Sequence, residues 1–227
     1  MKLNWAERLV VNNPVRVMIQ RLIIRWIKTR TRIPPQAIIL EIGCGRGAGA
    51  RLIQEEFQPA RLHAFDLDYR MIRAAVRYLT PQYTDRISLY VGDAVRLPYR
   101  DGVLDAVFGF GVLHHLPDWR GSVREIARVL KPGGIFCLEE FYPQFYQNFL
   151  ARRIFLHPEH DRFYSHDLHQ ALAEAGFGLQ GRLEHTGLGL LAVAVKQDLI
   201  CGEVGGGSRT APTKQTRYNF FKRRKAP

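Results

Sequence analysis

The run Ala37-Ile-Ile-Leu-Glu-Ile-Gly-Cys-Gly-Arg-Gly47 decides the expected fold. It begins as a short apolar stretch typical of a buried strand, then places three glycines where a strand would turn into a helix. Such a turn lets backbone N–H groups approach a nucleotide-type ligand closely. By itself the run leaves the ligand open, because Ala48 also permits the dinucleotide-binding pattern and Asp66 stands at the distance of a ribose-binding acid.

On both sides of this run, strand-like and helix-like segments alternate from residue 33 to about residue 197. This alternation predicts a parallel sheet with helices on both faces, and a tight turn at Thr186-Gly187 predicts a closing hairpin. We expect an α/β fold: a Rossmann-like, seven-stranded, mostly parallel sheet with helices on both faces and a C-terminal antiparallel hairpin strand. The expected strands are 37–41, 61–66, 87–91, 104–108, 135–139, 177–184 and 188–195, and the expected helices are 47–57, 68–79, 119–130 and 165–176.

Local signals set several of these boundaries. Asp68 and Ser165 are expected to cap helices, and Gly176 is expected to end one. Lys131-Pro-Gly-Gly134 is expected to stop a helix just before a strand.

The positive charge is concentrated at the two ends of the chain. The formal net charge is +12, and residues 1–32 and 204–227 each contribute +7, so the segment between them is near neutral. We predict a basic N-terminal helical extension (1–32), a cofactor-binding domain (33–203) and a basic, disordered tail (204–227).

Composition narrows the class of protein. No apolar run is long enough to cross a bilayer, and no signal peptide is apparent. The three cysteines Cys44, Cys137 and Cys201 have neither metal nor disulfide spacing, which predicts a reduced, cytoplasmic setting. Four nearby histidines lack ligand spacing, so no metal site is expected: His157, His160, His166 and His169.

Four further motifs accompany the glycine turn: Glu41 two residues before its first glycine, Val91-Gly-Asp-Ala94, Asp105-Ala-Val-Phe108 leading into Val112-Leu-His-His-Leu116, and Arg128-Val-Leu-Lys-Pro-Gly-Gly134. In this order they resemble the class I S-adenosylmethionine (SAM)-dependent methyltransferases. The resemblance covers roughly residues 36–196. It is strongest to the methyltransferase type 11 branch, which includes the ubiquinone and menaquinone C-methyltransferases.

The resemblance implies SAM as the cofactor and assigns it a site. Asp66 would accept hydrogen bonds from the ribose hydroxyls, and Asp93 would accept one from the adenine amino group. Glu41 would help to position the methionyl amine. The remaining residues would form the turn, pack on the adenine or line the methionine side: Gly43, Gly45, Gly47, Leu67, Ala94, Gly109 and Phe110.

Catalytic residues are harder to predict, because a methyltransferase mainly aligns the acceptor and excludes water. His114 and His115 stand where a general base would be placed, although such a pair can also serve only in packing. Glu140 and Tyr142, after the fifth strand, are further candidates.

The sequence favours a small, hydrophobic (quinone- or lipid-like) acceptor. Phe108-Gly-Phe-Gly111 replaces the Asn/Asp-Pro-Pro-Tyr/Phe signature of base-modifying enzymes. Residues 15–32 form a basic amphipathic helix that either meets an anionic membrane or packs on the sheet over the cofactor. The tail either joins this membrane contact, contacts RNA or only adds solubility. An RNA-associated enzyme and a non-catalytic SAM-binding scaffold remain alternatives.

Overall fold

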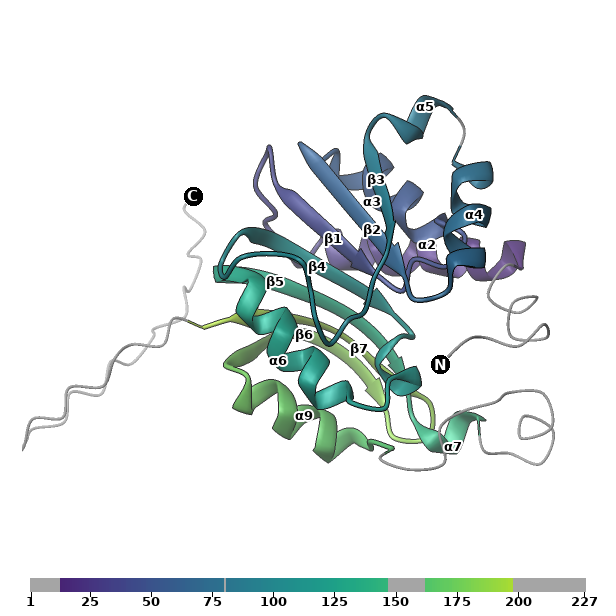
Figure 1. Ribbon diagram of the computed structural model, residues 1–227. Helices are drawn as coiled ribbons and strands as arrows, with labels where there is room; N and C mark the ends of the chain where they lie inside the picture. Colours follow the sequence, from purple (N-terminus) through teal and green to yellow (C-terminus); the bar gives the residue numbers. More distant parts are fainter. Residues whose placement is uncertain (1–12, 80, 147–161, 198–227) are drawn as a thin grey trace, which may run out of the picture.

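The structure is a computed structural model that describes residues 13–79, 81–146 and 162–197 (Figure 1). Its strands are β1 (Ile38–Ile42), β2 (Arg61–Asp66), β3 (Ile87–Val91), β4 (Leu104–Phe110), β5 (Leu130–Phe141), β6 (Phe177–His185) and β7 (Gly189–Lys196). Its helices are α2 (Pro14–Lys28), α3 (Ala48–Phe57), α4 (Tyr69–Tyr78), α5 (Pro81–Thr84), η1 (Leu113–His115), α6 (Trp119–Val129), α7 (Pro143–Tyr146) and α9 (Ser165–Glu174). The predicted tail, 204–227, lies outside the described residues, and the predicted domain boundaries stay predictions.

The strands form one sheet in the order β3-β2-β1-β4-β5-β7-β6. Strands β1 to β5 are mutually parallel, whereas β7 is antiparallel to both β5 and β6. The predicted fold class is therefore confirmed. Since the five parallel strands share one direction, their carboxyl ends meet at one edge of the sheet, where open α/β sheets bind ligands.

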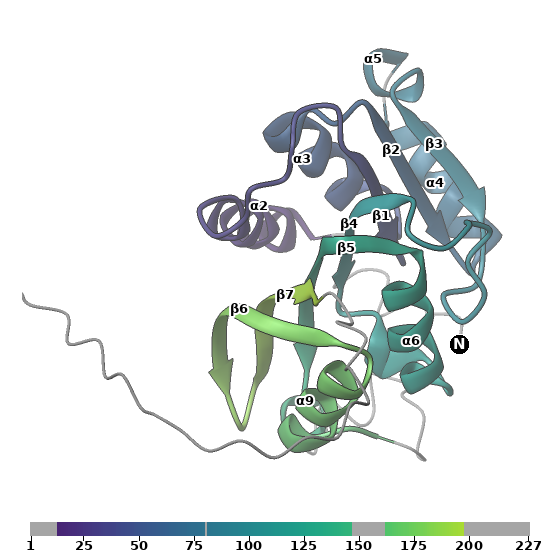
Figure 2. The same cartoon turned by 90° about the vertical axis from the view of Figure 1, so that its left-hand side faces the viewer.

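Helices cover both faces of the sheet, with α2 and α3 on one side and α6 and α9 on the other (Figure 2). One apolar cluster joins Ile24 of α2 and Ile53 of α3 to Ile39 and Phe108 of the sheet. A second cluster packs α6 and α9 on the opposite face, around Trp119. Two buried layers on a near-continuous apolar sheet are what a parallel α/β fold requires.

Two boundary predictions are wrong in detail. The residue that caps α9 is Tyr164, whose backbone N–H donates to Asp167 at 2.9 Å, and Ser165 is the first helical residue. The stretch Lys131-Pro-Gly-Gly134 does stop α6, but it belongs to β5, which begins at Leu130. Pairing of β4 with β5 shifts register between Leu104 and Ala106, where the partner residue changes from Leu130 to Ile135, so the extra residues of β5 lie outside the regular pairing.

Three basic side chains of α2 form ion pairs with acidic residues of α3. Arg21 bonds Glu55, and Arg25 and Lys28 both bond Glu56, so this basic stripe faces acidic residues of α3. The helix packs on α3 and the sheet, which is one part of the predicted alternative that placed it over the cofactor, and membrane contact stays a prediction. Among the described residues, no helix has the length and apolar character needed to cross a membrane.

Candidate functional site

A cavity of about 110 Å³ lies at the carboxyl ends of β1, β2, β3 and β4; it is termed the cofactor cavity because most of the residues predicted to bind the cofactor line it. Seven of the ten residues predicted to bind the cofactor line it: Gly43, Gly45, Asp66, Leu67, Asp93, Ala94 and Phe110. Strand ends that are far apart in the sequence therefore contribute to one site. The other three predicted residues, Glu41, Gly47 and Gly109, do not line the cavity.

The glycine turn takes a shape that other residues adopt only with strain. Gly43, Gly45 and Gly47 have φ angles of +64°, +54° and +88°, in the left-handed region that favours glycine. A Cβ on Gly43 would lie 2.5 Å from Val112, whereas a Cβ on Gly45 would meet no atom within 4 Å. Gly45 therefore presents bare backbone to the open cavity, as close approach of a ligand requires.

Asp66 joins the glycine turn to the start of α4. Its carboxylate accepts hydrogen bonds from the backbone N–H of Gly45 at 3.0 Å and of Asp68 at 2.8 Å. Burial raises the pKa of Asp66, and these two hydrogen bonds oppose that shift. The carboxylate is thus held in a fixed orientation at the cavity wall, where its remaining lone pairs can accept from a ligand.

Glu41 precedes the turn on β1 and is almost completely buried. Burial raises the pKa of Glu41 well above its usual range, and the nearby charge of Asp66 raises it further. Among the described residues, Oε2 of Glu41 has no hydrogen-bond partner. A Cβ on Gly49 would lie 1.9 Å from Oε1, so the glycine lets α3 approach this carboxylate. A buried acid with an unused acceptor fits the cationic amine of a cofactor.

The part of the cavity wall that follows β2 and β3 in the chain has apolar side chains and one carboxylate. Leu67 is 43% exposed there, Ala94 is buried, and Oδ1 of Asp93 accepts from the N–H of Val95 at 3.1 Å. The sequence reasoning missed Phe65 and Gly92, which also line this side. Each directly precedes a residue that was predicted, and only the three-dimensional path of the backbone shows that both also line the cavity.

The two cofactor-binding residues predicted at the end of β4 lie in different surroundings. Phe110 lines the cavity, whereas Gly109 packs on Ile42, to which its Cβ would come within 3.2 Å. Gly111, Val112 and Leu116 complete this wall and were not predicted, and His115, predicted as a catalytic candidate, lies beside them.

Glu140 is buried next to this wall and holds it in place. Its Oε1 accepts from the N–H groups of Val112 and Leu113 at 3.0 and 2.9 Å. Its Oε2 lies 3.3 Å from the backbone nitrogen of His114 and 2.8 Å from Nδ1 of the same residue. These contacts are those of a positioning group, and neither Glu140 nor His114 lines the cofactor cavity.

Tyr142 is also placed away from the cofactor cavity. It is fully buried, and its hydroxyl donates to Glu184 at 2.6 Å. Ser165 donates to the same carboxylate at 2.6 Å, and His169 lies 3.0 Å from it. This network joins β5, β6 and α9, so the contacts of Tyr142 are structural.

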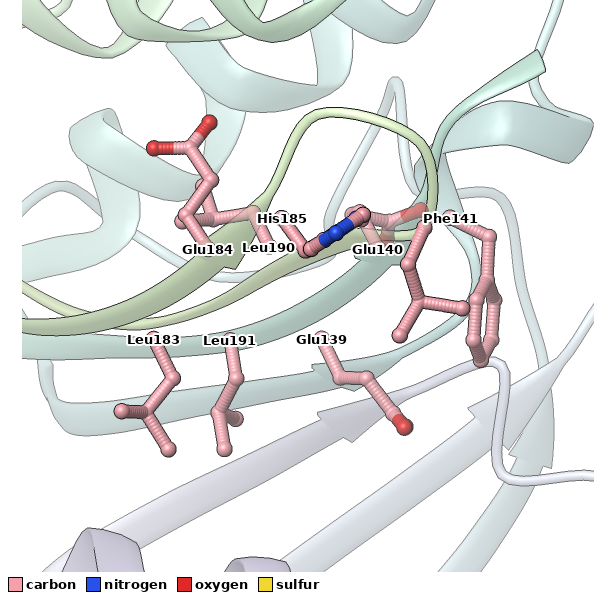
Figure 3. A pocket seen from close by; sticks show the side chains of 10 residues that line it. Glu139, Glu140, Phe141, Leu183, Glu184, His185, Leu190 and Leu191 are labelled. Atoms are coloured by element: carbon pink, nitrogen blue, oxygen red, sulfur yellow. The ribbon is translucent and has the colours of Figure 1, made fainter. Parts of the chain in front are cut away.

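A second, largely apolar cavity of about 310 Å³ lies at the ends of β5, β6 and β7 (Figure 3). The register aligns Glu139, Leu191 and Leu183 across the three strands, and Figure 3 shows their side chains on the same side of the sheet. Phe141 connects the two cavities, because it lines this one and its ring would lie 3.5 Å from a Cβ on Gly111 in the other.

No group of three metal-ligating side chains occurs within residues 13–79, 81–146 and 162–197. His157 and His160 lie outside these ranges, so the prediction of no metal site stays a prediction.

Comparisons with known proteins agree with this geometry. A family model described as a methyltransferase domain matches residues 40–138. A demethylmenaquinone methyltransferase of Lactiplantibacillus plantarum is 38% identical over 111 residues, which are 47% of this chain and 46% of that protein. A sterol 24-C-methyltransferase of Gibberella zeae is 34% identical over 110 residues, 48% of this chain and 29% of that protein. The chain thus spans less than half the length of these curated relatives.

Solved structures support the fold. A putative methyltransferase from Haloferax volcanii, solved with the Trm112 methyltransferase activator, superposes with a TM-score of 0.69 at 20% identity, over 85% of this chain and 94% of that one. Residues 40–138 of this chain therefore match a methyltransferase domain, and the sheet has the fold of solved methyltransferase structures.

Proposed function

We propose that this chain transfers a methyl group from SAM to a small, apolar acceptor. The observation that supports it most is the single cavity shared by Gly45, Asp66 and Asp93. In this proposal Asp66 accepts hydrogen bonds from the ribose hydroxyls and Asp93 accepts one from the adenine amino group. Glu41, behind the glycine turn, helps to position the methionyl amine. SAM supplies a methyl group on a sulfonium, which already has a good leaving group.

The protein's part in the reaction is then mainly alignment and exclusion of water. Gly45 brings the backbone close to the cofactor, and Glu140 holds the segment after β4 against the reacting region. His115 is the one predicted catalytic candidate that lines the cofactor cavity. It would accept the acceptor's proton where methylation releases one.

The cavity beyond Phe141 supports an apolar acceptor. Leucine residues form part of its lining, beside four ionisable residues: Leu183, Leu188, Leu190 and Leu191 with Glu139, Glu140, Glu184 and His185. Apolar walls with a few polar groups are typical of small-molecule sites. Relatives named for sterol, demethylmenaquinone and phytyl-hydroquinone substrates are consistent with this class.

Two measurements test the proposal. Thermal unfolding with SAM, S-adenosylhomocysteine and NAD should show stabilisation by the first two only, because a ligand that binds the folded state raises its stability. Transfer of labelled methyl groups into a cell extract should then place the label in the lipid fraction. Label in RNA would replace this function with an RNA-directed one, and binding without any transfer would identify a scaffold.

A further inference from the structure

The outward side of α2 carries a stripe of exposed apolar side chains. Val15, Met18, Ile19 and Leu22 are 56%, 59%, 43% and 60% exposed. Their spacing places them on one side of two helical turns. A single exposed apolar residue is ordinary, but four adjacent ones form a patch of the kind that marks an interaction surface.

The contacts of α2 fix this orientation. Ile24 and Ile27 are buried on the sheet side, and Arg21 and Arg25 pair with acids of α3. The helix therefore packs one apolar side within the molecule, while the paired bases of its basic stripe stay 37% to 58% exposed. The second apolar side, defined by Val15, Met18, Ile19 and Leu22, is left facing outward.

The surface beside the stripe, toward α3, carries a net positive charge. On the adjoining surface of α2 and α3, four bases outnumber the two acids they contact: Arg21, Arg25, Lys28 and Arg51 against Glu55 and Glu56. Arg30 and Arg32 follow the helix and are exposed. An apolar stripe beside an excess of partly exposed bases matches an anionic lipid interface, where the bases meet headgroups and the apolar side enters the acyl boundary. The same charge opposes pairing with a second copy.

We propose that the stripe Val15, Met18, Ile19 and Leu22 docks α2 in the plane of an anionic lipid bilayer. Arg16 of this helix bonds Glu139, which lines the apolar cavity. Docking would therefore bring that cavity near the bilayer. The docking itself concerns where the chain works and does not depend on methyl transfer.

The test is flotation of the full chain with vesicles of phosphatidylcholine containing phosphatidylglycerol. The double variant Met18→Gln/Leu22→Gln should lower the partition coefficient about tenfold, since interfacial binding scales with the apolar area buried. The matched control is Tyr69→Gln/Val76→Gln on α4, whose two side chains are 61% and 53% exposed. The control should partition like the unaltered chain, and pure phosphatidylcholine should bind all three more weakly.

Other results would overturn the proposal. Equal partitioning of both double variants would show that the stripe does not contact lipid. A dimer in sedimentation that the α2 variant dissociates, without vesicle binding, would assign the stripe to a second copy. A lower melting temperature of the α2 variant with unchanged flotation would mean that the chain's own residues cover it. Calorimetric titration of S-adenosylhomocysteine into each variant reports on the proposed function separately.

Discussion

Oε2 of Glu140 lies 2.8 Å from Nδ1 of His114, and both side chains are almost completely buried. The same carboxylate accepts from the backbone N–H groups of Val112 and Leu113. One acid at the end of β5 therefore fixes the segment after β4, whose next residue, His115, lines the cofactor cavity. The relationship makes the shape of the cofactor site depend on a residue outside it.

Glu140→Gln should weaken cofactor binding indirectly, by changing the position of the segment after β4. The side chain of glutamine has only one acceptor oxygen, so its NH2 group would face backbone N–H donors that now bond to the carboxylate. Leaving such donors unsatisfied costs about 1–3 kcal/mol. We expect lower affinity for S-adenosylhomocysteine in calorimetry well below the melting temperature. Glu184→Gln is the matched control, since Glu184 also receives several donors but lies outside the cofactor cavity. Equal loss of affinity in both variants would contradict the positioning role.

Asp66→Asn should reduce cofactor affinity more strongly than it reduces stability. The amide keeps the shape but loses charge and acceptor capacity toward two ribose hydroxyls, each worth about 1.5–3 kcal/mol as a bond to a charged group. Asp105→Asn is the control, because Asp105 also accepts from a backbone N–H, that of Ile38 at 2.8 Å, at the amino end of the strands. Calorimetry should show a defect for Asp66→Asn only.

Gly45→Ala tests the open space beside the glycine turn. Its φ of +54° makes any side chain strained by about 1–2 kcal/mol, and the added methyl group would enter the cavity. Gly102→Ala carries similar strain at φ +63°, also with no atom within 4 Å, but outside the cavity. Both variants should melt at lower temperature, and only Gly45→Ala should lose cofactor affinity. Unchanged affinity would place the cofactor elsewhere.

Local signals were sufficient to predict the sheet, and the family resemblance supplied most of the residues that line the cofactor cavity. Glycines with positive φ and acids at strand ends, such as Gly45 and Asp66, are required by the chain's own geometry, so they are visible in the sequence. The role of Glu140 was not, because it depends on the parallel pairing of β4 with β5. The orientation of α2 was equally hidden, because it depends on tertiary contacts. Ile24 and Ile27 pack into the core, and basic residues of the helix pair with Glu55 and Glu56 of α3.

Glu41 should make the stability of the cofactor-free protein depend on pH. Because its pKa is raised in the folded state, mainly by burial, the folded protein binds this proton more tightly than the unfolded chain does. Its stabilising effect is complete below the usual range of a glutamate and is lost as pH rises through the raised pKa. Glu41→Gln should therefore flatten the fall of melting temperature with rising pH. The control is Glu174→Gln, because Glu174 is exposed, and this variant should leave the pH profile of the melting temperature unaltered. An unflattened profile for Glu41→Gln would contradict the raised pKa.

Arg16 and Glu139 tether the first turn of α2 to the end of β5 through two parallel contacts, and their side chains are only 20% and 10% exposed. Arg16→Gln would leave a largely buried carboxylate without its partner, so we expect a loss of about 1–3 kcal/mol in the free energy of unfolding, reduced from the fully buried case by the remaining exposure. Arg25→Gln on the same helix breaks a more exposed pair with Glu56 and should cost under about 1 kcal/mol. Because Glu139→Gln removes the buried charge, the double variant Arg16→Gln/Glu139→Gln should recover part of the loss in chemical denaturation. Simple additivity of the two changes would show that the pair does not couple α2 to the sheet.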